Sequence, residues 1–179
     1  MMNLYLRLLG LLFRLPFVPR RDLFAPSRVS FRVWPNDCDL NFHMNNGRYL
    51  AFIDLARLHF MAQAALFRPL VRHHWRPVLS ALEINFIRSL KPLQKFDVVT
   101  RVLTWDGKYV YMEHRFEAGG VLYASATARG LFLHGGRTVT IAEVIRTLGL
   151  KLSPPPMPAL VNHWKELTVL KKEHSMRNA

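Results

Sequence analysis

Cysteine is almost absent from this chain, because Cys38 is the only one among 179 residues. A single thiol excludes a disulfide framework and any zinc site built from several thiolates. Long apolar runs are missing too. The most apolar stretch, residues 4–18, is interrupted by Arg7, Arg14 and Pro16. It falls short of the roughly 20 apolar residues that a bilayer crossing needs. The sequence therefore predicts neither a disulfide scaffold nor a membrane-spanning protein.

Acidic residues are also scarce, with 12 Asp and Glu against 25 Lys and Arg, and the formal net charge is +13. Such a surface attracts phosphates, anionic lipids or nucleic acid. The basic excess is spread along the chain, however, and no helix-turn-helix, RNP-like or zinc-finger pattern accompanies it. We therefore expect no nucleic-acid partner. The length and the 50% hydrophobic content predict one compact domain with short extensions.

The N-terminal stretch, residues 4–18, predicts a basic amphipathic helix that Pro16 closes. Its polar positions share one face, and they are Asn3, Arg7, Gly10 and Arg14. The other face carries Leu4, Leu8, Leu11, Leu12 and Leu15. Two interpretations stay open: residues 1–18 make a peripheral membrane contact, or the leucines dock on the chain's own domain or a dimer partner. The pattern lacks a secretory cleavage site, so we expect a cytoplasmic protein, free or membrane-associated.

The central region begins with a strand and a long helix. Alternation predicts a strand over residues 29–34, and apolar spacing predicts a helix over residues 46–67, with Asn45 and Asn46 as capping candidates. The apolar positions of this helix are Leu50, Ile53, Leu55, Leu58, Met61, Ala62 and Ala65. So wide an apolar arc is typical of a helix that is buried on most sides.

Period-two alternation returns in the second half of the chain. Four strands are predicted over residues 78–88, 96–105, 109–116 and 121–133, as an antiparallel meander. Helices over residues 141–148 and 159–172 follow, separated by three prolines. We therefore expect an α+β fold in which a long antiparallel sheet wraps around one central helix. The domain itself is placed at residues 29–136, between an N-terminal helix and linker (1–28) and a C-terminal helical extension (137–179).

Polar side chains are densest just before the central helix. Asp39, Asn41 and His43 alternate, so in an extended segment they project to one side, and the helix start nearby offers free backbone N–H groups. A carboxylate beside such donors suits acyl transfer, because it can attack a carbonyl or activate water while the N–H groups hold the oxyanion. The alternative is that these are ordinary loop, cap and structural residues. Cys38 lies between two aspartates, which disfavour its thiolate.

At these residues the sequence resembles the hotdog-fold thioesterases of the 4-hydroxybenzoyl-CoA thioesterase type. The matching segments are Asp37-Cys38-Asp39, Tyr49-Leu50 and Asp54-Leu55-Ala56-Arg57. The resemblance implies a hotdog fold in which Asp39 is the catalytic carboxylate, the Asn46 N–H polarises the thioester carbonyl and Asp54 is a supporting acid. It also implies that basic groups near the end of the second strand, Arg88 and Lys91, face coenzyme A.

Two further resemblances bear on the activity. The run from Asp39 to Asn46 resembles the plant acyl-ACP thioesterases, which implies catalytic roles for Asn41 and His43. The run from His43 to Leu50, together with Trp105-Asp106-Gly107-Lys108, is most similar to the thioesterase superfamily member six proteins. A hotdog hydratase is disfavoured, since its motif has a proline after the Asn and a His five positions after the Asp. Residues 29 to about 135 carry these resemblances.

The family resemblance implies hydrolysis of acyl-CoA or acyl-carrier-protein thioesters to free acid and thiol, within lipid metabolism. It implies a homodimer or homotetramer whose site lies at the interface, with no metal and no cofactor other than the CoA of the substrate. The alternative hypothesis is a catalytically weak hotdog protein that binds acyl chains or lipids at the membrane surface. The basic N-terminal helix motivates that alternative.

Overall fold

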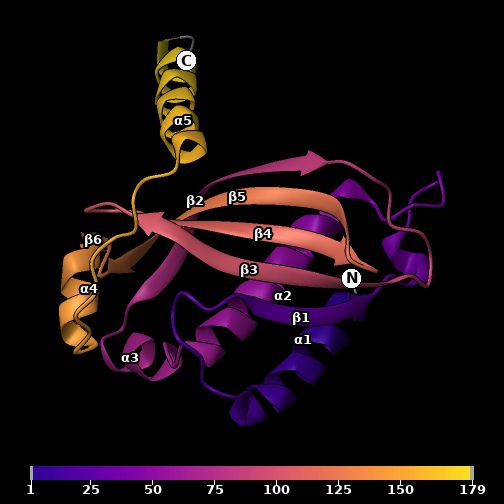
Figure 1. Cartoon of the computed structure of the whole chain (residues 1–179), viewed down its shortest axis with the longest axis horizontal. Coiled ribbons are helices and arrows are strands. Elements are labelled where there is room, and N and C mark those ends of the chain that lie inside the picture. Colours follow the sequence, from indigo (N-terminus) through magenta and orange to yellow (C-terminus); the bar gives the residue numbers. More distant parts are fainter. Residues whose placement is uncertain (1, 178–179) are drawn as a thin grey trace.

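A curled antiparallel sheet forms one side of the molecule in the computed structural model, which describes residues 2–177 (Figure 1). Its strands are β1 (Ser27–Arg32), β2 (Arg76–Phe86), β3 (Lys95–Trp105), β4 (Val110–Ala118), β5 (Val121–His134) and β6 (Arg137–Val139). Alternation predicted the first five to within two residues at each end, because each has one face against the core. The short β6 was not predicted.

The strand order is β1-β3-β4-β5-β2, with β6 beside β5. The predicted meander is therefore correct for β3, β4 and β5 but wrong for β2, which pairs with β5 rather than with β3. The connection over residues 87–94 carries the chain from β2, at one edge of the sheet, to β3, which lies next to β1 at the other edge. Its Leu90 carbonyl accepts the Met44 N–H at 2.9 Å, and its Leu93 N–H donates to the Val33 carbonyl at 2.8 Å. These contacts hold the connection beside the end of β1. Because β2 and β3 are not neighbours in the sheet, they do not form a hairpin.

The central helix α2 (Asn46–Gln63) packs across the sheet, mainly against β1 and β3. Its buried positions are Tyr49, Phe52, Ile53, Leu55, Ala56, Phe60 and Gln63. They point in several directions, as expected of a helix with neighbours on more than one side. The helix ends four residues earlier than predicted, because Ala65 adopts φ 55° and the Leu66 N–H turns back to the Met61 carbonyl. A short helix, α3 (Phe67–Arg72), follows.

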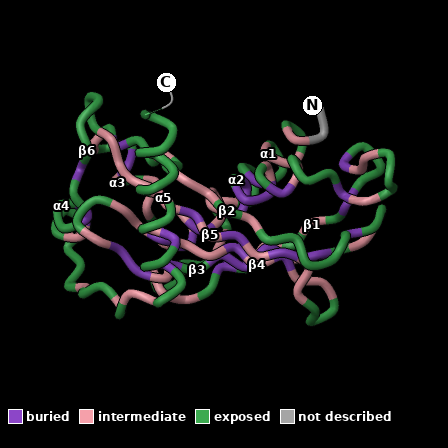
Figure 2. Tube along the Cα trace, turned by 90° about the horizontal axis from the view of Figure 1, so that it is seen from above, coloured by how far each residue is buried: buried purple, intermediate pink, exposed green. Residues whose placement is uncertain are grey.

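Aromatic rings fill the space between α2 and the sheet. Phe52 packs edge-on to Phe96, with ring centroids 5.0 Å apart, and Tyr49 packs against Phe116 at 4.8 Å. Small side chains on β5 leave room for these rings, since alanines alternate along its buried face. In Figure 2, buried segments run along α2 and β3 to β5, with exposed segments around them. This packing fixes the position of the start of α2.

The N-terminal helix α1 (Met2–Arg14) continues into a 3-10 turn, Leu15–Phe17, and lies beside α2. The leucines that pack on the core are Leu4, Leu8, Leu11 and Leu15. The sequence prediction placed Leu12 on this face and Arg7 toward water. Both placements were wrong: Leu12 is exposed, and the Arg7 side chain is turned inward and only 12% exposed. The Asn3 side chain lies outside the part that the structure describes.

Two helices end the chain, α4 (Ile141–Thr147) and α5 (Ala159–Arg177), the second five residues longer than predicted. The first turns of α5 are fixed by buried Val161 and Trp164 and by a 3.0 Å ion pair between Lys165 and Asp106. Beyond them the helix projects from the body of the molecule (Figure 1). Within residues 2–177, no helix is both long enough and apolar enough to cross a bilayer.

Candidate active site

The segment between β1 and α2 folds into a tight loop at the amino end of α2. The Asp39 N–H donates to the His43 carbonyl at 3.0 Å, and the Phe42 N–H donates to the Asp39 carbonyl at 3.1 Å. A β-bridge between Cys38 and Met44 closes the base of the loop. Phe42 adopts φ 56° with its side chain exposed, a left-handed conformation that costs about 1 kcal/mol in a residue other than glycine. The loop thus has a defined shape.

Asp39 sits at the beginning of this loop, with its side chain partly open to solvent. Its Oδ1 accepts the Asn41 backbone N–H at 2.9 Å, which fixes the carboxylate against the loop backbone. Among the described residues, no side chain forms an ion pair with it. The Asn41 side chain is exposed and His43 is half-buried, both on the same loop. The structure therefore brings the three predicted residues together within one turn.

The start of α2 offers fewer free donors than the sequence suggested. The Asn45 side chain accepts the Gly47 N–H at 2.9 Å as a helix cap, and the Asn45 N–H donates to the Asp37 carbonyl at 2.9 Å. The Asn46 N–H, between them, makes no hydrogen bond to any described residue. As the first residue of the helix, it also lies at the positive end of the helix dipole. Asn46 is thus the donor that remains for an incoming anion.

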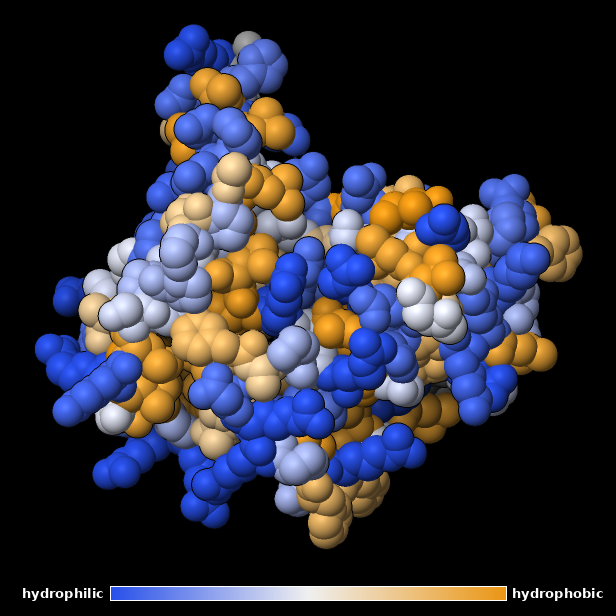
Figure 3. Space-filling model, in the orientation of Figure 1, coloured by the Kyte–Doolittle hydropathy of each residue, from blue (hydrophilic) through white to orange (hydrophobic). Residues whose placement is uncertain are grey.

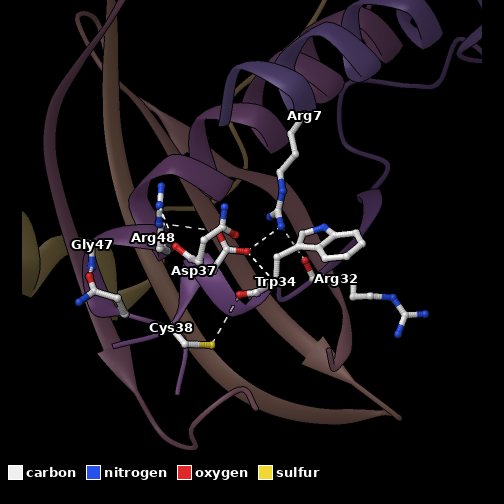
Figure 4. Close-up of polar contacts among 9 residues, drawn as sticks. Arg7, Arg32, Trp34, Asp37, Cys38, Gly47 and Arg48 are labelled. Atoms are coloured by element: carbon white, nitrogen blue, oxygen red, sulfur yellow. Dashed lines mark hydrogen bonds and ion pairs between the residues drawn. The ribbon is translucent and has the colours of Figure 1, made fainter. Parts of the chain in front are cut away.

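Asp37, two residues before Asp39, has the opposite environment. Its side chain is 3% exposed, and its Oδ2 lies 2.6 Å from an Arg7 Nη2 of α1 and accepts the Trp34 N–H at 2.8 Å. On the other oxygen, Oδ1, Arg48 Nε approaches to 3.6 Å. Figure 4 shows Arg7 reaching down from its helix and Arg48 approaching from α2. These contacts pin the first residue of the Asp37-Cys38-Asp39 run.

Arg7 is held from three sides at this point. Besides Asp37, it donates to the Arg32 carbonyl at 2.9 Å, and its guanidinium lies 4.6 Å from the centre of the Phe52 ring. Burial lowers the pKa of Arg7, and the neighbouring Asp37 carboxylate opposes that shift. Sequence reasoning missed this residue, because 30 positions separate Arg7 from Asp37 and no local pattern joins them.

Cys38 is a poor nucleophile in this setting. Burial raises the pKa of its thiol, and the carboxylates of Asp37 and Asp39 raise it further. Its Sγ faces the Trp34 carbonyl at 3.6 Å. The raised pKa of the Cys38 thiol agrees with the sequence prediction that its thiolate is disfavoured. Burial contributes more to the shift than the two neighbouring carboxylates on which the prediction rested.

Arg88 and Lys91 lie on the connection that runs past the loop. The Leu90 carbonyl between them accepts the Met44 N–H, and the Leu90 backbone also hydrogen-bonds the buried Tyr49 hydroxyl, whose pKa burial raises. Arg88 donates to the Leu122 carbonyl at 2.9 Å, while the Lys91 side chain is exposed. Both cations therefore stand near the start of α2 without an acidic partner among the described residues.

Asp54 lies apart from the other predicted site residues. It is eight residues along α2 from Asn46, about 12 Å along the helix axis. Its side chain is 67% exposed and pairs with Arg57 at 3.1 Å. Within the described chain it does not contact the loop that carries Asp39.

An apolar cavity of about 100 Å³ lies at the opposite end of α2 from this loop. The carboxyl-terminal half of α2, the sheet and α4 line it, and the lining includes Phe60, Met61, Trp105, Ile141 and Ile145. None of the predicted site residues lines it. Within residues 2–177, no group of three His, Cys, Asp or Glu side chains is arranged to hold a metal ion.

Comparison with known proteins places the chain in a family. The thioesterase-like superfamily matches residues 33–164. Protein THEM6 of Xenopus laevis is 32% identical over 146 residues, covering 80% of this chain and 69% of the frog protein. The solved structure of YbaW, a probable thioesterase of Escherichia coli, superposes with a TM-score of 0.64 at 20% identity, over 68% of this chain and 96% of that one.

A second similar structure was solved with bound ligands. It is a thioesterase of Thermus thermophilus complexed with coenzyme A and zinc, with a TM-score of 0.59 at 25% identity, covering 71% of this chain and 93% of that one. These structures share the sheet-wrapped helix, so the fold is the hotdog fold that the sequence predicted. With most of its length matched by the superfamily, the chain belongs to the thioesterase-like superfamily of hotdog proteins, whose general activity is thioester hydrolysis.

Proposed function

We propose that this protein hydrolyses acyl-CoA thioesters and that Asp39 is its catalytic carboxylate. The observation that carries the proposal is the placement of Asp39, partly open to solvent and without an ionic partner among the described residues, on a tight loop that leads into the start of α2 and its Asn46 N–H. A solved relative binds coenzyme A, and two unpaired cations, Arg88 and Lys91, stand near the same helix start, where they suit the phosphates of that group.

In this proposal Asp39 acts on the thioester carbonyl, either directly or through a water molecule that it deprotonates. The carbonyl oxygen gains charge as the new C–O bond forms, and the Asn46 N–H and the helix dipole stabilise it. If water attacks, the C–S bond breaks and the thiol leaves with the proton that Asp39 took from the water. If Asp39 attacks directly, the C–S bond breaks to give a mixed anhydride on Asp39 and a thiolate, and water then hydrolyses the anhydride to free acid and supplies the proton of the thiol. Asn41 and His43 orient the water or the carboxylate, while Asp54 is a more distant supporting acid.

A second copy of the chain completes the site in this proposal. Strand β2 is an edge of the sheet, and in the described residues nothing pairs with its outer side. It is 11 residues long, and Leu79 and Phe86 on it are about two-fifths exposed. Natural proteins rarely leave so long an edge open. An antiparallel β2–β2 contact would cover it and bring two Asp39 loops into one assembly.

The decisive experiment is a hydrolysis screen over acyl-CoAs from short to long chains, with detection of the released thiol. Asp39→Ala should lower kcat/KM by at least roughly 100-fold on the best substrate, since it removes the acting carboxylate. Asp22→Ala is the matched control, because the Asp22 carboxylate makes the same kind of bond, to the Phe24 N–H at 2.8 Å, away from the loop.

Two results would overturn the assignment. If the wild-type protein hydrolyses no member of the panel, the chain is the catalytically weak binder of the alternative hypothesis. If Asp39→Ala keeps most of the wild-type kcat/KM, another group performs the reaction. Light scattering on the same preparations measures whether the protein is a dimer or a larger assembly.

A further inference from the structure

The helix α1 is apolar on two faces, and only one of them is covered. Its inner leucines pack on the core, whereas the side chains on its outer face are between 47% and 71% exposed. These outer residues are Tyr5, Leu6, Leu9, Leu12 and Phe13, and Phe17 in the following turn is 85% exposed. They recur every three to four positions, as required for one continuous face. We refer to these six residues as the outer face of α1.

This outer face is larger than scattered surface hydrophobicity explains. In Figure 3, apolar side chains project from the lower rim of the molecule, where the carboxyl end of α1 lies. Contiguous apolar surface of this kind marks an interaction site, because water solvates it poorly. The length of α1, 13 residues or about 20 Å, allows it to lie on a surface but not to cross a bilayer.

The charged side chains of α1 and of the segment after it, up to residue 21, are all basic. Residues 1–21 contain no acidic residue, and the exposed arginines Arg14, Arg20 and Arg21 lie at the carboxyl end of α1 and in the segment after it. Arg7 points to the opposite side of α1 and pairs with buried Asp37, so its charge does not contribute to the outer surface. An apolar helix face that is followed by exposed arginines, with no acidic residue between them, is typical of helices that lie in the headgroup region of anionic bilayers.

We propose that the outer face of α1 docks on an anionic lipid bilayer, with its apolar side chains in the acyl boundary and its arginines at the phosphates. The same charges disfavour a second copy of this chain as the occupant. A twofold contact between two outer faces would bring both sets of arginines together with no acidic partner from residues 1–21.

Docking of this kind has a defined geometry. Because Arg7 holds the opposite side of α1 against Asp37, the helix lies between the bilayer and the loop before α2. The bilayer surface would then lie about one helix diameter, roughly 10 Å, from that loop. The docking itself does not depend on catalysis, since the outer face contains none of the residues assigned to hydrolysis.

The test is co-sedimentation of the full chain with phosphatidylcholine vesicles that contain or lack phosphatidylglycerol, in the absence of substrate. Wild type should bind the anionic vesicles, and Leu6→Gln/Phe13→Gln should lower the partition coefficient at least about tenfold, because two side chains no longer enter the acyl boundary. Arg14→Gln/Arg20→Gln should weaken binding to anionic vesicles and leave the weak binding to neutral vesicles unchanged.

Leu160→Gln/Met176→Gln on α5 is the matched control, because these side chains are 64% and 70% exposed in another basic helix. It should bind as wild type does. The proposal fails if wild type does not sediment with anionic vesicles, or if Leu6→Gln/Phe13→Gln binds as tightly as wild type. It also fails if that double variant converts an oligomer to a smaller species, since the outer face would then be a protein contact. Hydrolysis by the same variants, measured on a water-soluble acyl-CoA, should stay at the wild-type level.

Discussion

Asp37 and Asp39 are two residues apart and have opposite environments. Asp37 is buried, with Arg7 and Arg48 on its carboxylate, whereas Asp39 is partly open and bonded only to a backbone N–H among the described residues. A buried carboxylate with charged partners is a structural group, because those partners fix its position and removing it leaves them buried without a counter-charge. An accessible carboxylate on a rigid loop is available to a substrate. The contrast predicts that the first aspartate contributes stability and the second activity.

The largest expected effect is on the free energy of unfolding of Asp37→Asn. The substitution leaves Arg7 buried without its carboxylate, and breaking a buried pair in this way costs about 3 to 5 kcal/mol. Urea unfolding followed by circular dichroism measures it. Asp39→Asn should change the same free energy by less than about 0.5 kcal/mol. Equal losses in the two variants would contradict the distinction between them.

Arg7→Met should cost less, about 2 kcal/mol, because Asp37 keeps the Trp34 N–H and Arg48 while methionine fills part of the space. A double-mutant cycle sharpens this result. If Arg7 and Asp37 act on each other, the variant with both Arg7→Met and Asp37→Asn loses less stability than the two single variants together. Strict additivity would show that the 2.6 Å contact contributes nothing of its own.

His114 offers a third case, a buried polar ring without a counter-charge. It is fully buried, its Nδ1 lies 2.9 Å from the Thr100 hydroxyl, and burial lowers its pKa from 6.5 to about 3, with Arg57 adding to the shift. The unfolded chain therefore takes up a proton below pH 6.5 that the folded protein refuses. The free energy of unfolding should fall by about 1 to 2 kcal/mol from this group between pH 6.5 and about pH 5.

The control for this pH dependence is His114→Gln, which keeps a polar side chain at the site but cannot titrate. The variant is less stable at neutral pH, yet its stability should fall less steeply with acid than that of wild type. If both proteins show the same slope over this range, other groups cause the acid sensitivity.

The smallest expected change in the free energy of unfolding concerns the two asparagines at the start of α2. As with Asp37 and Asp39, one neighbour has a structural bond, the Asn45 cap, and the other, Asn46, has an exposed side chain. Asn45→Ala removes the cap on the Gly47 N–H and should lower the free energy of unfolding by about 1 kcal/mol. Asn46→Ala should change it by a few tenths, because the exposed Asn46 side chain caps nothing. Thermal unfolding of the matched pair distinguishes the cap from its neighbour.

Most of the secondary structure could be predicted from local pattern. Alternation located β1 to β5, because this signal depends only on neighbours in sequence. The strand order could not be read in this way. It depends on the connection 87–94, whose hydrogen bonds to Val33 and Met44 join residues about 45 to 60 positions apart.

The loop of the candidate site could be located from the sequence, because Asp39, Asn41 and His43 lie within five consecutive positions. Their part in catalysis stays a prediction. The orientation of α1 was wrong because an amphipathic pattern assigns every arginine to water. Arg7 turns inward because it pairs with the buried carboxylate of Asp37. The two residues are far apart in the chain, so a single sequence carries no signal for this pair.

The apolar cavity beyond the far end of α2 gives this protein a place for a small apolar molecule. Its lining, which includes Phe60 and Trp105, is almost free of polar side chains, so water gains few hydrogen bonds there. A volume of about 100 Å³ can hold an atom such as xenon. Because the lining comes together only in the folded chain, xenon should raise the free energy of unfolding.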